Sequence, residues 1–193
     1  MIHKRTKIDL NGKFSNFDLK EMSGKEVDIF IKEVNTSLDI SLEDIELIAY
    51  DFDGVLTDNK VIVDQNGKES VAANRSDGLA VSMFSKLGIK QIIISTEVNE
   101  VVARRAEKIK IPYIHGVKDK LAVMKKYMSE NKINKDKVIF AGNDLNDKEV
   151  MEYIAYPVAP ADAALEILKI SKIVTVKKGG DGVIRELFDI LTN

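Results

Sequence analysis

The chain contains no cysteine, only two histidines and only three prolines among its 193 residues. Without cysteine it can form neither disulfides nor thiolate metal sites. No apolar run is long enough to span a bilayer, and the polar start MIHKRTKIDLNGK lacks the pattern of a signal peptide. The 29 Lys and Arg residues face 31 Asp and Glu residues, so there is no basic excess for nucleic-acid binding. We therefore expect a cytoplasmic protein that binds neither a membrane nor nucleic acid.

Two regions of the chain differ in character. Residues 1–46 are rich in Lys, Asp, Asn and Ser and show little regular pattern, which predicts an N-terminal extension or linker. Within it, the apolar spacing between Val27 and Val34 favours one short helix. Residues 47–193 alternate short apolar runs with amphipathic segments, and this length suits one α/β domain.

The apolar runs are short, rich in β-branched residues and without alternation, as buried parallel strands are. They lie at 47–50, 91–94, 112–114, 137–141, 155–158 and 172–176. Helical patterns separate most of them, with apolar faces around Ala80 and Phe84, Val98 to Val102, Leu121 to Met128, and Val150 to Ile154. This alternation predicts a doubly wound, Rossmann-like parallel sheet with helices on both faces.

One insertion interrupts the alternation of strands and helices. Residues 61–63 and 69–71 are apolar or extended and flank Asn66-Gly67, the pair preferred in two-residue hairpin turns. The sequence therefore predicts a β-hairpin with a two-residue turn. Between Asp58 and Ser95 there is room only for this hairpin and one helix.

Polar residues follow several of the predicted strands. Asp51-Phe52-Asp53 follows the first, Ser95-Thr96 the second and Gly142-Asn143-Asp144-Leu145-Asn146-Asp147 the fourth, while Lys118 and Lys120 precede the helix after the third. In an open parallel sheet these strand ends meet at one edge, where ligands bind. Carboxylates are hard ligands suited to Mg²⁺, and a hydroxyl with a lysine can stabilise a transferring phosphoryl group. The sequence therefore predicts a magnesium-dependent phosphoryl-transfer site.

These four motifs resemble those of the haloacid-dehalogenase superfamily, over roughly residues 47 to 191. The resemblance implies that Asp51 is the nucleophile that forms an aspartyl-phosphate and that Asp53 is the general acid and base. It also implies that Ser95 binds phosphate, with Thr96 as the alternative, and that Lys120 is the motif lysine, with Lys118 as the alternative. An acid at the second position of the first motif marks the phosphatases and phosphomutases of that superfamily.

The fourth motif departs from the family pattern at Asn143, where the superfamily often has Asp. The metal set implied by the resemblance is therefore Asp51 and Asp53 with Asn143 or Asp144 as the third ligand. Asp147 would orient waters or Lys120. The short segments around the first three motifs leave no room for a cap domain, so we expect an open active site covered by a neighbouring subunit.

A closer resemblance is to the capless 3-deoxy-manno-octulosonate 8-phosphate phosphatases and their relatives, which include nonulosonate 9-phosphate phosphatases and domains attached to acylneuraminate cytidylyltransferases. The hairpin, Asn74-Arg75-Ser76-Asp77-Gly78 and the segment 179–186 carry it. It implies a homotetramer that acts on a phosphorylated 2-keto-3-deoxy sugar acid. The implied substrate-binding residues are Thr57, Arg75, Ser76, Asp77, Thr96 and Arg185.

Three other functions compete with a phosphatase as interpretations of this sequence. The first is a non-catalytic oligomerisation module associated with an acylneuraminate cytidylyltransferase, against which the intact Asp51, Asp53 and motif lysine argue. The second is a signalling receiver domain, whose phosphoacceptor follows the third strand, where this chain has His115-Gly116. The third is a phosphomutase, which usually needs a cap to retain its bisphosphate intermediate.

Overall fold

The computed structural model describes residues 40–192, which lie within one compact unit. Its main sheet has six strands in the order β5-β4-β1-β6-β7-β8, and all neighbouring pairs are parallel. The strands are β1 (Leu47–Tyr50), β4 (Lys90–Ile94), β5 (Tyr113–Ile114), β6 (Val138–Ala141), β7 (Tyr156–Ala159) and β8 (Ile173–Val174). Each of the six predicted runs therefore forms a strand, and β1 lies between β4 and β6.

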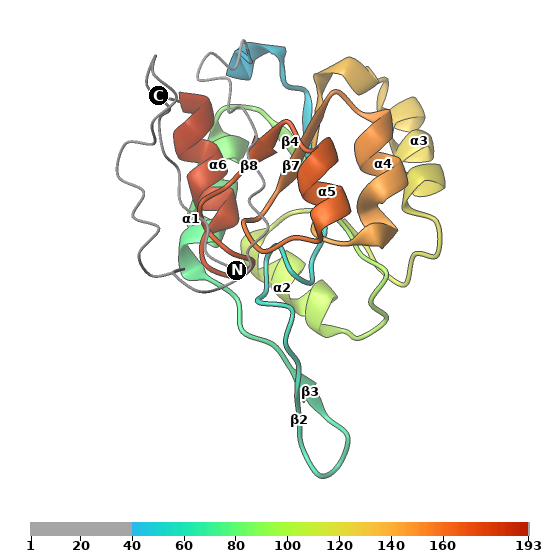
Figure 1. The fold of residues 1–193 in the computed structure, drawn as a ribbon, viewed down its shortest axis with the longest axis vertical. Helices are drawn as coiled ribbons and strands as arrows, with labels where there is room; N and C mark the ends of the chain where they lie inside the picture. The colour runs from blue at the N-terminus through green and yellow to red at the C-terminus, as the bar shows by residue number, and fades with distance from the viewer. Residues whose placement is uncertain (1–39, 193) are drawn as a thin grey trace, which may run out of the picture. The chain divides into compact units, whose positions relative to one another are not determined.

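Helices cover both faces of this sheet (Figure 1). They are α1 (Arg75–Lys86), α2 (Val101–Ile109), α3 (Lys120–Asn131), α4 (Lys148–Tyr153), α5 (Leu165–Ile170) and α6 (Val183–Thr192). Short 3₁₀ helices are η2 (Leu42–Asp44), η3 (Lys135–Lys137) and η4 (Leu145–Asp147). The sequence did not predict α5, and α2 begins later than expected, which leaves Val98 exposed in the loop before it. The predicted doubly wound α/β fold is confirmed.

The two faces of the sheet have separate cores because successive strand residues point to opposite sides. Leu47, Ala49 and Phe140 pack in one buried cluster with residues of α3, α4 and α5, such as Met124 and Val150. On the other face α1 packs against α6, and the rings of Phe84 and Phe188 meet edge to face at 5.0 Å. Apolar burial on both sides accounts for the continuous apolar runs of these strands.

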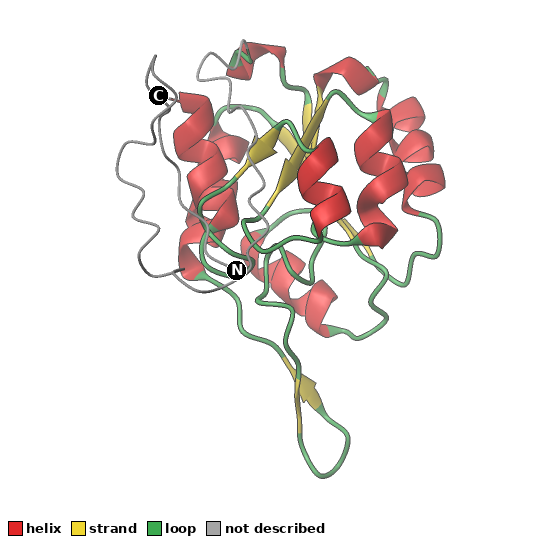
Figure 2. Cartoon of the chain, viewed as in Figure 1, coloured by secondary structure: helices red, strands yellow, loops and turns green. Residues whose placement is uncertain are grey.

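The predicted hairpin exists, with strands β2 (Ile62–Val63) and β3 (Glu69–Ser70), and it extends away from the helical layers (Figure 2). The prediction of a two-residue turn is wrong. The Asp64 N–H donates to the Lys68 carbonyl, so three residues, Gln65 to Gly67, form the loop. Gly67 has a φ of 77°, whereas Asn66 does not have the positive φ that the predicted turn requires. The Asp64 carboxylate accepts the N–H groups of Asn66 and Lys68, which favours the longer loop.

The short helix predicted around Val27 to Val34 lies outside the described residues, as does most of the predicted extension 1–46. The described part of that extension contains η2 and Ile45, which is buried. Within residues 40–192, no helix combines the length and the apolar character that a membrane span requires.

Candidate active site

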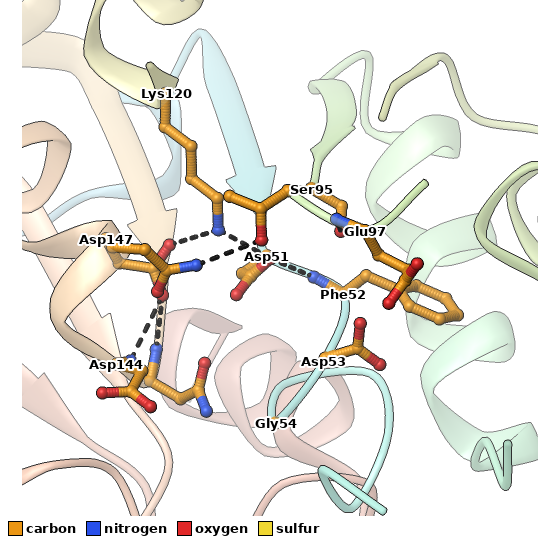
Figure 3. Close-up of polar contacts among 12 residues, drawn as sticks. Asp51, Phe52, Asp53, Gly54, Ser95, Glu97, Lys120, Asp144 and Asp147 are labelled. Atoms are coloured by element: carbon orange, nitrogen blue, oxygen red, sulfur yellow. Dashed lines mark hydrogen bonds and ion pairs between the residues drawn. The ribbon is translucent and has the colours of Figure 1, made fainter. Parts of the chain in front are cut away.

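The carboxyl end of the main sheet gathers the acids, the hydroxyl and the lysine that the sequence singled out (Figure 3). Asp51 follows β1, Ser95 follows β4 and Asp147 ends the turn that follows β6. Lys120 is the first residue of α3, whose N-cap is Asp119, and its side chain extends into the site. Lys118, the alternative lysine, is exposed. Neighbouring parallel strands therefore bring together residues that are up to 96 positions apart.

A buried ion cluster of three residues lies at the centre of the site. Lys120 Nζ is 2.8 Å from Asp51 Oδ1 and 2.6 Å from Asp147 Oδ1. The other oxygen of Asp147, Oδ2, accepts the N–H groups of Asn143 at 2.8 Å and Asp144 at 3.3 Å. Both oxygens of Asp147 are therefore used inside the protein. Asp147 thus contacts the Lys120 ammonium, which also contacts Asp51.

Burial and the neighbouring charges set the protonation of this cluster. Burial and the negative charge of Asp147 raise the pKa of Asp51 to about 7, although the Lys120 ammonium acts in the opposite direction. Burial acts to lower the pKa of Lys120, but the carboxylates of Asp51 and Asp147 outweigh it and the pKa is raised. Lys120 therefore stays charged. A second cation beside Asp51, in addition to Lys120, would favour the ionised form of Asp51.

The two oxygens of Asp51 have different surroundings. Oδ1 accepts the Phe52 N–H at 2.7 Å in addition to its contact with Lys120. Oδ2 has no hydrogen-bond partner within residues 40–192. Asp51 also lines the cavity described below. One oxygen is thus fixed by the protein while the other is available to a ligand.

Ser95 is buried directly after β4, beside the ion cluster. Its Oγ accepts the Glu97 N–H at 3.1 Å, and its hydroxyl proton has no acceptor within the described residues. Thr96, the alternative phosphate-binding residue, is exposed at the cavity wall, where its Oγ1 accepts Asn146 Nδ2 at 3.3 Å. The geometry of Ser95 leaves a hydrogen-bond donor for an anion.

Asp53 is half-buried at the edge of the cavity. Thr57 Oγ1 donates to its Oδ1 at 3.2 Å, so Thr57, which is itself fully buried, orients this carboxylate rather than lining the cavity. Burial raises the pKa of Asp53, the Thr57 hydrogen bond lowers it, and the charges of Glu97 and Glu69 raise it further. Glu97 lies on the same side of the site as Asp53 (Figure 3).

Asn143 fits the role of an oxygen ligand. Its Oδ1 is buried and has no hydrogen-bond partner in the described chain, which is unusual for a native protein. Its amide packs so closely on Gly54 that a side chain at position 54 would collide with it. Asp144, the alternative ligand, is exposed and caps η4 through the Leu145 N–H at 2.7 Å. A divalent cation beside Asp51 would satisfy the unpaired Asn143 oxygen.

These groups face a cavity of about 360 Å³. It is lined by Asp51, Asp53, Asn59, Thr96, Asn143, Asp144 and Asn146. Asn59 and Asn146 were missed by sequence reasoning. Asn59 has a φ of 60°, a backbone conformation that Asn adopts more readily than most residues. An Asn in the turn after the first motif could therefore have indicated a residue at the cavity. A larger groove of about 840 Å³ lies at the opposite end of the strands, away from these acids.

The loop that carries Asp53 and Gly54 is covered by a glycine pair near the C-terminus. The Gly180 N–H donates to the Val55 carbonyl at 3.1 Å. A Cβ on Gly179 would lie 2.7 Å from the carbonyl carbon of Gly54, and one on Gly180 would lie 2.6 Å from Asp58 N. Only glycine allows this close approach of two backbones.

Besides Thr57, four predicted substrate-binding residues do not line the cavity in this chain. Arg75 is exposed at the first position of α1, and Ser76 Oγ donates to its N-cap, Asn74, at 2.8 Å. Arg185 Nε contacts both oxygens of Asp189 on its own helix, at 3.0 and 3.1 Å. Asp77, the fourth, is fully buried. These residues lie at the adjoining N-terminal ends of α1 and α6.

Asp77 joins α1 to α6. Its Oδ1 accepts the Arg185 N–H at 3.0 Å, at the first turn of α6, while its Oδ2 has no partner within the described residues. Burial raises the pKa of Asp77 to about 6, even though the N–H groups of Arg185 and Ile184 and the charge of Arg105 act to lower it. In this chain Asp77 therefore has a structural contact between two helices.

Known proteins are similar to this chain over most of its length. A family of haloacid dehalogenase-like hydrolases matches residues 86–187. The 3-deoxy-D-manno-octulosonate 8-phosphate phosphatase of Salmonella typhi is 31% identical over 159 residues, which are 82% of this chain and 85% of that protein. The N-acylneuraminate cytidylyltransferase A of Danio rerio is 30% identical over 146 residues, or 75% of this chain, but the match spans only 34% of that protein.

Solved structures match the same region. The 3-deoxy-D-manno-octulosonate 8-phosphate phosphatase from Moraxella catarrhalis, solved in complex with magnesium ion, phosphate ion and KDO, superimposes with a TM-score of 0.75 at 28% identity. The match covers 78% of this chain and 87% of that one.

Proposed function

This chain belongs to the haloacid dehalogenase-like hydrolases and is a phosphatase, and from that premise we propose that it hydrolyses a phosphorylated 2-keto-3-deoxy sugar acid through an aspartyl-phosphate, with Mg²⁺. The observation that carries the proposal is the buried cluster of Asp51, Lys120 and Asp147. It fixes one oxygen of Asp51 and leaves the other available at a cavity that Asp53 also lines.

Each residue has a defined part in the proposed reaction. The free oxygen of Asp51 attacks phosphorus, the bond from phosphorus to the ester oxygen breaks, and Asp53 gives its proton to the leaving alcohol. In the second half Asp53 takes a proton from water as the water oxygen bonds to phosphorus and Asp51 is released. Lys120 and the Ser95 hydroxyl stabilise the negative charge on the phosphoryl oxygens.

Mg²⁺ would supply further positive charge next to the phosphoryl group. Asn143 and Asp51 would hold it, Asn143 through its Oδ1, which is buried without a partner in the described chain, and Asp51 through the oxygen that does not attack phosphorus. Asp144 remains the alternative third ligand, and Asp53 is assigned chiefly to proton transfer. The relative from Moraxella catarrhalis, which holds magnesium and phosphate, supports this choice of metal.

The substrate class rests on relatives named for an octulosonate 8-phosphate. We propose that Arg75, Ser76, Thr96 and Arg185 contact the sugar acid in a homotetramer, in which neighbouring subunits cover the open cavity. The exposed apolar side chains of the hairpin, Val61, Ile62 and Val63, are 51%, 70% and 56% exposed and would be buried in such an assembly. Sedimentation of wild type and Ile62→Asp tests this, with dissociation expected for the variant.

The test of the activity is phosphate release in Mg²⁺ from a panel of substrates. The panel contains an octulosonate 8-phosphate, a nonulosonate 9-phosphate, a hexose 6-phosphate and an aryl phosphate. We expect turnover of one ulosonate phosphate to exceed that of the hexose phosphate. Asp51→Asn should lower it by at least on the order of 10³-fold, because the amide cannot form the phosphoenzyme. EDTA should abolish it and added Mg²⁺ should restore it.

Asp58→Asn is the matched control, because Asp58 lies in the same loop and, among residues 40–192, its carboxylate has polar contacts only with the ammonium of Lys60 at 3.6 Å and with the Lys60 N–H. It should keep wild-type turnover. Turnover of no panel member would overturn the proposed activity and favour the non-catalytic oligomerisation module. Turnover that survives Asp51→Asn would refute the aspartyl-phosphate.

A further inference from the structure

The segment between β8 and α6 turns back onto the first motif. Residues 178–181, the glycine turn, form a β-turn that the Asp181 N–H closes by donating to the Lys178 carbonyl at 3.0 Å. Gly180, its third residue, has a φ of 74°, as in a type II turn, where glycine is favoured. Gly179, its second residue, is buried. The turn therefore has one fixed shape and one buried side.

Two carboxylates hold the glycine turn against the domain. Asp162 Oδ1, in the loop between β7 and α5, accepts the Gly179 N–H at 2.9 Å. Glu186, in the first turn of α6, accepts the Val176 N–H on Oε1 and the Lys177 N–H on Oε2, both at 2.8 Å. Hydrogen bonds to a carboxylate are among the stronger ones in proteins. Because Gly179 is buried by its own chain, its bond to Asp162 is complete without the neighbouring subunits proposed above.

The glycine turn packs directly on the loop that carries the general acid. The Gly180 N–H donates to the Val55 carbonyl at 3.1 Å. A Cβ on Gly179 would collide with the Gly54 carbonyl and would lie 2.9 Å from the Thr57 carbonyl oxygen. The turn thus contacts three successive parts of this loop, and backbones packed so closely do not shift independently.

Thr57 links this loop to the carboxylate of Asp53. Its Oγ1 donates to Asp53 Oδ1 at 3.2 Å and accepts the N–H groups of Gly54 at 3.3 Å and Asn59 at 3.4 Å. Thr57 is fully buried, so water does not replace these partners. The direction of the Asp53 carboxylate therefore depends on where the backbone places Thr57, whose carbonyl the glycine turn contacts.

We propose that Asp162 and Glu186 are positioning residues that, through the glycine turn, hold the first-motif loop and with it the carboxylate of Asp53. This inference rests on the proposed function for its kinetic consequence only. Proton donation requires Asp53 within hydrogen-bond reach of the leaving oxygen, and a misplacement of about 1 Å is costly. The nucleophile Asp51 is held separately by Lys120, so loosening the turn should leave it in place.

The two acids allow a graded set of variants. Glu186→Ala removes two acceptors and Asp162→Ala removes one, whereas Asp162→Asn keeps an oxygen for the same N–H group. Each variant retains the backbone bond from the Ala161 N–H to the Lys177 carbonyl at 3.0 Å, so the segment keeps part of its support. Glu166→Ala is the matched control. Glu166 is an exposed acid in the first turn of α5, and its side chain has no hydrogen bond or ion pair within residues 40–192.

The direct readout is hydrogen exchange in the first-motif loop, which does not depend on activity. The N–H groups of Leu56 and Thr57 donate to the Phe52 carbonyl at 3.0 and 3.2 Å. A loosened loop opens these bonds more often, and its amides exchange faster. Mass spectrometry of a peptide covering residues 52–60 therefore reports on the loop.

Exchange in that peptide should be roughly tenfold faster in Glu186→Ala and Asp162→Ala than in wild type. It should be unchanged in Asp162→Asn, because the hydrogen bond is kept, and in Glu166→Ala. A second peptide, from residues 120–131 of α3, should exchange alike in all these proteins. That comparison separates a local loosening from a loss of global stability.

The kinetic readout compares good and poor leaving groups of similar shape. 4-Nitrophenol leaves without help from an acid, whereas phenol is the weaker acid and gains more from proton donation. In Glu186→Ala, kcat/KM for phenyl phosphate should therefore fall about tenfold. For 4-nitrophenyl phosphate it should change by less than about twofold. A purely structural defect, or the loss of a neighbouring subunit, would lower both alike.

Two results would overturn the proposal. One is unchanged exchange of the loop in both alanine variants, and the other is an equal fall of kcat/KM for the two aryl phosphates in Glu186→Ala. If exchange behaves as expected while no phosphate ester turns over, the proposed function fails and the positioning of the loop by Asp162 and Glu186 stands.

Discussion

Two buried carboxylates on opposite faces of the sheet have different surroundings. Asp147, in the turn after β6, has a lysine on one oxygen and two N–H groups on the other. Asp77, in α1, has the first turn of α6 on one oxygen and no partner for the other within residues 40–192. The comparison teaches that two fully buried carboxylates can be satisfied in different ways. Asp147 faces a full cation and two N–H groups, whereas Asp77 faces only the partial positive charge of a helix end.

The largest effect is expected from removing that cation. Lys120→Met leaves the carboxylates of Asp51 and Asp147 buried with no positive charge between them. Breaking a buried ion cluster in this way should lower the free energy of unfolding by about 3–5 kcal/mol at pH 7. Phosphate release should fall by on the order of 10²-fold or more. Urea unfolding and the phosphate assay measure the two changes.

The matched control is Lys118→Met, because Lys118 is exposed two residues earlier. It should unfold at the wild-type urea concentration and retain activity. Equal stability of the Lys120→Met protein and wild type would show that the cluster is not what stabilises Asp147.

A smaller effect is expected from Asp77, and it depends on pH. The pKa of Asp77 is raised from 3.8 to about 6 in the folded state, so the native protein binds a proton that the unfolded chain releases. Its contribution to stability is fully present below about pH 4 and is lost as the pH rises through 6. The loss amounts to about 3 kcal/mol by pH 7, at 1.36 kcal/mol per pKa unit.

Asp77→Asn removes this titration, so its stability relative to wild type should improve between pH 4 and pH 7. Urea unfolding across that range checks the slope, and Asp136→Asn, at an exposed position, should leave it unchanged. A wild-type slope that survives Asp77→Asn would assign the titration to another group.

The smallest effect is expected at the glycines beside the two acids. A Cβ at Gly142 would lie 2.7 Å from three atoms of Asp147, so Gly142→Ala must displace that carboxylate and should lower the unfolding free energy by about 1–3 kcal/mol. A Cβ at Gly78 would meet the γ2 methyl of Ile109 at 3.1 Å, a closeness that a shift of a few tenths of an ångström relieves. Within α1, Gly78→Ala should change stability by less than about 1 kcal/mol. Calorimetry of both variants checks this, and an equal loss at both positions would contradict it.

The sequence predicted that polar side chains gather at one edge of the sheet, because three of them obey a local rule. Asp51, Ser95 and Asp147 each follow an apolar strand, and the carboxyl ends of parallel strands meet at one edge of the sheet. The strand order itself was not needed. The family assignment, which used the same motifs, is confirmed by the relatives.

Contacts between distant segments could not be predicted in this way. Asp77 and Arg185 are 108 residues apart, and nothing near either one indicates that their helices adjoin. The hairpin loop was misjudged because the Asp64 side chain, rather than Asn66-Gly67, selects the loop length. The roles of Arg75, Ser76 and Arg185 toward a substrate stay predictions.

The glycine pair over the first-motif loop also sets when the enzyme is completed during its synthesis. Gly179 and Gly180 pack on the backbone of Gly54 to Asp58, so that loop reaches its final form only after position 180 has left the ribosome. At 5–20 residues per second, roughly 6–26 s separate the synthesis of Asp51 from that of Gly180. During that interval the nascent chain already carries its nucleophile but cannot yet hold it in the finished loop.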